Sequence, residues 1–174
     1  MSVLGELQPN KVFKYFEEIC SIPHGSRNLQ QISDYLVDFA KAHELKYRQD
    51  EDLNVIIWKD GSKGYEASEP VILQGHMDMV AVKEADCDKD MEKEGLDLEI
   101  NGDYISAKGT SLGGDDGIAV AYTLAVLDDE EMAHPPIEAI FTVNEEIGML
   151  GAATIDVSDL KGRLFMNMDS EDEG

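Results

Sequence analysis

Cysteine is scarce in this sequence. Cys20 and Cys87 are the only two cysteines in 174 residues, and they do not form a CxxC pair. Two cysteines so far apart suggest neither a disulfide framework nor a zinc site built from thiolates. We therefore expect a protein of a reducing compartment, in which any metal site uses other ligands.

Basic residues are also scarce. Lys and Arg together number 14 against 37 Asp and Glu, which gives a formal net charge of −23. Such a surface repels phosphate backbones and anionic lipid, and it concentrates cations. Solubility or adaptation to salt explains most of these charges, but nucleic acid and membrane are not expected partners.

Long apolar runs are absent. No segment approaches the ~20 apolar residues that span a bilayer, and the first ten residues lack the basic and apolar regions of a secretory signal. We therefore expect a soluble, cytoplasmic protein. Its length and its 43% apolar content suit one domain with a substantial core.

Hydrophobic periodicity predicts helices that alternate with strands. Helical spacing indicates helices over 9–20, over 29–40 with Asn28 as N-cap, from 118, and from 148. Apolar runs predict strands at 53–58, 71–76, 137–143 and 163–168, a hairpin turns at Asn101-Gly102, and 83–94 reads as an exposed loop. The alternation predicts an α/β fold with a mixed, mostly parallel sheet flanked by helices.

Polar side chains follow three of these strands. His76 ends the strand at 71–76 and Asp78 comes two residues later, Glu145-Glu146 follows the next strand, and Asp169 follows the last. In α/β folds, ligands gather beyond the carboxyl ends of strands. Acidic doublets are common in this chain, but position distinguishes Glu145-Glu146, because a doublet directly after an apolar strand is not explained by a solvated helix face.

A glycine-rich segment, 109–117, precedes the helix predicted from 118. Such a loop can bind phosphate, but two carboxylates, Asp115 and Asp116, occupy the place of the phosphate, and there is no GxxxxGK[ST] motif. The pair indicates either an N-terminal cap or metal ligands. Carboxylates and imidazole without thiolate suit zinc, manganese or cobalt, and two such ions can share one bridging carboxylate.

Four motifs together carry a resemblance: His76-Met-Asp-Met, Gly109-Thr-Ser-Leu-Gly-Gly-Asp-Asp, Asn144-Glu-Glu-Ile-Gly and Asn167-Met-Asp. In this order they resemble the co-catalytic zinc metallopeptidases related to aminoacylase and glutamate carboxypeptidase. The aminoacyl-histidine dipeptidase subgroup, also called cytosol non-specific dipeptidase or bacterial carnosinase, is the most similar. The resemblance implies a zinc exopeptidase-like catalytic domain that hydrolyses Xaa-His and other dipeptides with two divalent ions.

The resemblance also implies roles for single residues. His76 and Asp169 match ligands of one metal, Glu146 matches a ligand of the other, and Asp115 matches the bridging carboxylate. Asp78 would orient His76, as metal-bound imidazoles usually require, and Glu145 would be the general base. Asp116 is a departure, because related dipeptidases often have Asn there.

Some features of the family find no match. The family completes its second metal with a histidine near the carboxyl end of a longer polypeptide, and an inserted lid domain binds substrate and often dimerises. We therefore expect residues 1–174 to be the amino-terminal part of the catalytic domain, inactive or nearly so alone, with a homodimer formed by the full-length protein. The alternatives are an amide deacylase or carboxypeptidase of the same clan, or a non-catalytic acidic module that binds cations or a protein.

Overall fold

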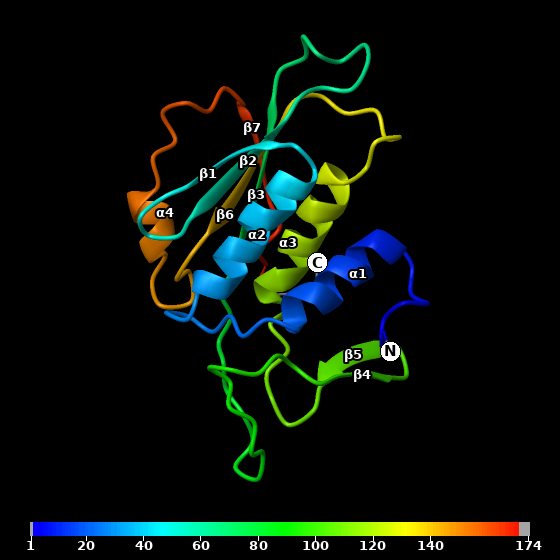
Figure 1. Ribbon diagram of the computed structural model, residues 1–174, viewed down its shortest axis with the longest axis vertical. Helices are drawn as coiled ribbons and strands as arrows, with labels where there is room; N and C mark the ends of the chain where they lie inside the picture. Colours follow the sequence, from blue (N-terminus) through cyan, green and yellow to red (C-terminus); the bar gives the residue numbers. More distant parts are fainter. Residues whose placement is uncertain (1, 171–174) are drawn as a thin grey trace.

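The computed structural model describes residues 2–170, which form two helices, then five strands, and then helices and strands in alternation (Figure 1). In chain order these elements are α1 (Asn10–Cys20), α2 (Gln30–Ala42), β1 (Lys46–Gln49), β2 (Val55–Lys59), β3 (Val71–His76), β4 (Leu98–Asn101), β5 (Tyr104–Ala107), α3 (Gly114–Leu127), β6 (Ile137–Thr142), α4 (Leu150–Thr154) and β7 (Leu164–Asn167). Within this part of the chain, no helix is both long enough and apolar enough to cross a membrane.

One five-stranded sheet organises the domain, in the order β1-β2-β6-β3-β7. β2 pairs antiparallel with β1 and β6, whereas β3 pairs parallel with β6 and β7. β6 lies at the centre and every one of its residues is buried, including the polar Glu138 and Thr142. The predicted mixed sheet flanked by helices is confirmed, and the parallel pairing is confined to β6, β3 and β7.

Helices α2 and α3 cover one face of the sheet, and α1 packs against α3 (Figure 1). Alternate residues of each strand face the two sides, so Leu73 joins the large core under these helices while Ile72 joins a small cluster on the other face. Ile155 and Leu160, from the segment that contains α4, pack over this small cluster. The sheet is therefore buried on both faces near its centre.

The structure corrects two details of the sequence interpretation. Asn28 does not cap α2: the N-cap position is Leu29, without a side-chain cap, and the Asn28 amide donates to the carbonyl of Glu92. The strand β1 was not predicted, because Lys-Tyr-Arg-Gln has neither an apolar run nor two buried faces. It forms because the edge of β2 offers a hydrogen-bonding partner, which the local sequence does not reveal.

Parallel pairing places the carboxyl ends of β6, β3 and β7 along the same edge of the sheet. Helix α3 packs on β3 and begins at this edge. Gly75 permits the close approach, because a Cβ there would lie 2.8 Å from Asp116 Oδ2 and 3.0 Å from Ala119 Cβ. The fold therefore brings the loops after three strands and the start of one helix to a common point.

Replacing Gly151 by Ala should destabilise the fold by about 1–3 kcal/mol, the usual cost of overpacking. A Cβ at Gly151 would lie 2.5 Å from the carbonyl oxygen of Val143, which itself accepts the Gly151 N–H. Urea denaturation of the metal-free chain measures the effect. Gly114→Ala is the matched control, because the nearest atom to its new Cβ is 3.8 Å away, and equal stability of the two variants would contradict the prediction.

Candidate metal centre

His76 is the last residue of β3, and its side chain is 1% exposed. The ring atom Nδ1 lies 2.9 Å from the carbonyl oxygen of Asp78, and Nε2 lies 3.1 Å from Asp115 Oδ1 and 3.8 Å from Glu145 Oε2. A carbonyl can only accept, so Nδ1 carries a proton and Nε2 is the atom available to a cation. The imidazole is therefore held with its ligand nitrogen toward the carboxylates.

Two groups of side chains could each hold a metal ion, and His76 belongs to both. One group adds Asp115 and Glu146, the other adds Glu145 and Asp169, and the ligand atoms within each group lie within 4.8 Å of one another. The structure thus brings together the four predicted ligands and the predicted base. The assignment of each ligand to one of two ions stays a prediction. Glu145, which is the predicted base and not a predicted ligand, lies as close to His76 and Asp169 as a ligand would.

The electrostatics of the site favour a cation. Burial lowers the pKa of His76, but hydrogen bonding to Asp78 and the charges of Asp116, Asp78 and Glu145 outweigh it and raise that pKa to about 9. Burial, together with the neighbouring carboxylates of Asp115, Asp78 and Glu145, also raises the pKa of Glu146 against the opposing effect of His76. Oxygen and imidazole ligands in such a field fit a divalent ion such as zinc or manganese.

Asp78 makes more contacts than the sequence indicated. Its buried carboxylate accepts hydrogen bonds from Ser26 Oγ at 2.8 Å and from the Glu145 N–H at 3.0 Å, and Oδ1 lies 3.6 Å from His76 Nδ1. Burial raises the pKa of Asp78, but the hydrogen bonds from His76, Glu145 and Ser26 together lower it. The His76 Nδ1 atom is closer to the Asp78 backbone carbonyl, at 2.9 Å, than to the Asp78 carboxylate, at 3.6 Å. The carboxylate therefore also serves to orient the backbone of Glu145, whose N–H it accepts at 3.0 Å.

Asp115 and Asp116 have different surroundings although they are neighbours. The Asp115 side chain is 57% exposed and points to His76, whereas Asp116 is buried and Oδ2 accepts the His76 N–H at 3.2 Å. Burial raises the pKa of Asp116 to about 7, aided by Asp169 and Asp115 and opposed by His76. No side-chain cap is found at the start of α3: the backbone of Asp115 and Asp116 is non-helical, and their carboxylates face His76 instead of the first N–H groups of the helix.

Three residues that the sequence analysis did not single out hold the loops after β3 and β6. Asn54 Oδ1 accepts the Val143 N–H at 3.1 Å, the Arg27 N–H donates to Asn144 Oδ1 at 2.8 Å, and Ser26 holds Asp78. These residues lie far from the acidic motifs in sequence, so no local pattern identifies them. His24 and His134 belong to neither of the two groups found among the described residues.

Comparison with known proteins finds two dipeptidases that share 40% identity with this chain. The chain is 40% identical over all 174 residues to the cytosol non-specific dipeptidase of Escherichia coli, of which it covers 36%. It is also 40% identical to a solved aminoacylhistidine dipeptidase of Vibrio alginolyticus, with a TM-score of 0.94 over 98% of this chain and 35% of that one. The chain therefore spans about a third of the length of these two relatives.

A tripeptidase structure from Staphylococcus aureus shares the fold, with a TM-score of 0.77 and 23% identity over 95% of this chain and 44% of that one. No family model matches the sequence.

Replacing Asp78 by Asn should destabilise the metal-free chain by about 1–3 kcal/mol, since a buried amide cannot accept all the hydrogen bonds of the carboxylate. The carboxylate faces three donors, namely Ser26 Oγ, the Glu145 N–H and the His76 ring. Ser26→Ala, which removes one of these donors, is the graded control and should cost less. Chemical denaturation measures both, and an Asp78→Asn variant as stable as the wild type would contradict this account.

Proposed function

Because the chain is a homologue of the cytosol non-specific dipeptidases, we propose that it carries most of the catalytic centre of a metal-dependent dipeptidase. The observation that supports this proposal most directly is the geometry around His76, where four carboxylates from three segments of the chain have ligand atoms within 4.8 Å of one imidazole. The proposed substrates are dipeptides, of the Xaa-His type and broader, and the proposed compartment is the cytoplasm.

We propose His76, Asp115, Glu146 and Asp169 as the ligands of two divalent ions, zinc in the first place. When bound, such ions polarise a peptide carbonyl and lower the pKa of a water molecule. Asp78 would fix the imidazole and the Glu145 backbone, and buried Asp116 would hold the backbone of His76 through its N–H. The ligand set thus rests on a second set of hydrogen bonds, as metal sites usually require.

Glu145 is the proposed general base. Its side chain is 24% exposed, so it can reach both the site and incoming substrate, and its backbone N–H is fixed by Asp78. It would take a proton from the attacking water and deliver that proton to the leaving amine. An amide deacylase or carboxypeptidase of the same clan would use the same chemistry, so the dipeptide assignment depends on the two relatives that share 40% identity.

The chain should bind zinc through His76. We expect His76→Ala to weaken zinc binding at least 10-fold, because the buried ring belongs to both candidate groups. Glu145→Gln should retain the wild-type affinity, because Glu145 is the proposed base and not a proposed ligand. Isothermal titration calorimetry measures both. His43→Ala is the matched control, since that ring lies beyond the carboxyl end of α2 and pairs with Asp128. Equal zinc affinity of the His76→Ala variant and the wild type would contradict the proposed centre.

Replacing Glu145 by Gln in the complete product of the gene should lower dipeptide turnover about 100-fold or more, the usual contribution of a general base. Metal content by elemental analysis should stay unchanged. Retained turnover would favour another base, and loss of one ion would make Glu145 a ligand. We expect the 174-residue chain alone to show little activity even with zinc or manganese supplied, because its described residues bring one imidazole to the site.

A further inference from the structure

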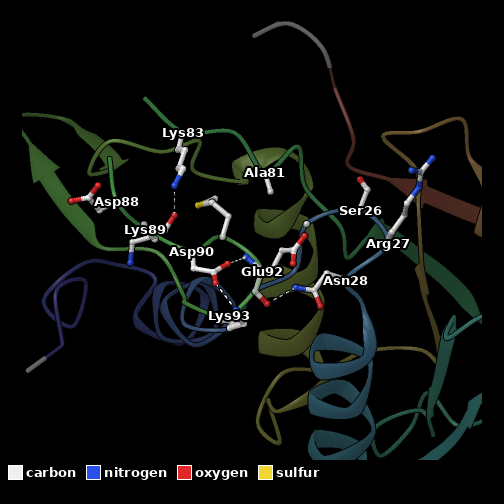
Figure 2. Close-up of a pocket in the computed structure, with 12 residues that line it drawn as sticks. Ser26, Arg27, Asn28, Ala81, Lys83, Asp88, Lys89, Asp90, Glu92 and Lys93 are labelled. Carbon is white, nitrogen blue, oxygen red and sulfur yellow. Dashed lines mark hydrogen bonds and ion pairs between the residues drawn. The ribbon is translucent and has the colours of Figure 1, made fainter. Parts of the chain in front are cut away.

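The loops after β3 and β6 are held beside the metal centre by the loop at 25–28, through its hydrogen bonds to Asp78 and Asn144. Figure 2 shows part of this loop along a cavity, where Asn28 donates to the loop on the other side at 2.9 Å. Within the described part of the chain, β7 makes no hydrogen bond with the loop at 25–28. The strand that leads to Asp169 is therefore positioned by other contacts.

β7 lies at the edge of the sheet and buries little of its own surface. All four of its residues are exposed, among them the apolar Leu164, Phe165 and Met166. Among the described strands, β7 pairs with β3 alone. The register of a strand is set strongly where one of its faces is buried, and weakly where neither face is. The apolar pattern of β7 therefore does little to fix its position along β3.

The position of β7 decides where Asp169 lies. Asp169 comes two residues after the strand ends at Asn167, and its carboxylate lies within 4.8 Å of the ligand atoms of His76 and Glu145. A strand rises about 3.3 Å per residue. A shift of β7 by one residue would therefore carry Asp169 about 3.3 Å away from its place in this group.

One buried carboxylate holds the segment that enters β7. Glu138 lies in β6 and is buried, on the face of the sheet that also carries Ile140. Its carboxylate accepts the Lys161 N–H at 3.0 Å and the Gly162 N–H at 2.9 Å. The backbone is closely packed here, since a Cβ at Gly162 would lie 2.9 Å from the carbonyl oxygen of Pro70. The entry to β7 is therefore attached to the central strand.

Glu138 holds this entry more firmly than the exposed ion pair beside it. Arg163, the residue before β7, pairs with Glu69 at 3.8 Å, but both side chains are exposed and such pairs contribute little. A buried carboxylate, by contrast, needs its hydrogen-bond partners, because water does not replace them. The hydrogen bonds that the Glu138 carboxylate accepts from described residues all come from the segment 161–162. Glu138 and the entry to β7 therefore fix each other.

We propose that Glu138 is a positioning residue of the metal centre, which sets the register of β7 and so places Asp169. Asp169 is a ligand only within the proposed function, on which this role of Glu138 therefore rests. Glu138 and Phe165 are both level with Ile72 in the sheet, and Asp169 comes four residues after Phe165. Glu138 thus acts through the strand, over about 13 Å, and not by contact with the ion.

Zinc binding by the 174-residue chain, measured by calorimetry, tests this role as a double-mutant cycle. Glu138→Ala should weaken zinc binding about 10-fold, as loss of a group that supports a metal ligand does. In the Asp169→Asn background the same substitution should change the affinity by about 2-fold or less, because residues that act through one another are not additive. Glu138→Gln, which keeps one acceptor oxygen, should give an intermediate loss, and it replaces the alanine variant if that variant fails to fold.

Hydrogen exchange of the metal-free chain checks the attachment of β7 directly. The amides of β7 should exchange about 10-fold faster in the Glu138→Ala variant than in the wild type, whereas those of β2 should stay protected. Glu17→Ala is the matched control, because Glu17 also accepts two backbone N–H groups, those of Val3 and Leu4, in a segment that holds no member of either candidate group. It should leave the zinc affinity unchanged.

Unchanged zinc affinity of the Glu138→Ala variant, unchanged exchange in β7, or an equal loss with and without Asp169 would overturn the role of Glu138 and leave the proposed function intact. An Asp169→Asn variant that binds zinc as the wild type does would overturn it too, because Glu138 would then have no ligand to position. A wild-type chain that binds no zinc would overturn both.

Discussion

Repulsion among carboxylates at one edge of the sheet is the constraint on which the rest of the site depends. Asp115, Glu145, Glu146 and Asp169 meet around His76, where burial weakens solvent screening. Hydrogen bonding to Asp78 and the charges of Asp116, Asp78 and Glu145 raise the pKa of His76 to about 9, whereas burial is the main cause that raises the pKa of Asp116 to about 7. Each shift shows an environment that favours positive charge, and a divalent cation supplies more of it than a proton does.

The fold holds this unfavourable arrangement through hydrogen bonds from behind the site. Asp78 accepts from Ser26 and from the Glu145 backbone, and Asn54 fixes the end of β6 through the Val143 N–H. Such contacts limit the separation that repulsion would otherwise cause. They also connect the loop at 25–28 to the loops that follow β3 and β6, through the hydrogen bonds of Ser26 to Asp78 and of the Arg27 N–H to Asn144.

Much of the fold follows from local pattern. The apolar runs at β3, β6 and β7, the Asn101-Gly102 turn between β4 and β5, and the stripes of α1 and α2 each carry a signal that the structure confirms. Elements with weak local signals were missed or misjudged. β1 is polar and forms because β2 offers a free edge, and Asn28 spans two loops instead of capping a helix, because its partner at Glu92 lies 64 residues away.

The sequence by itself determined which residues have metal-ligand chemistry and that His76, Glu145-Glu146 and Asp169 lie at the end of a strand or just after one, because a strand and the residues after it are contiguous. Only the tertiary structure decided the rest: that β6, β3 and β7 end at one edge, that Asp115 faces His76 while Asp116 is buried beneath it, and that Ser26 and Asn54 support the centre. The physical reason is that these relations depend on strand order and on side-chain direction across 39 to 89 residues of chain, which no local pattern specifies.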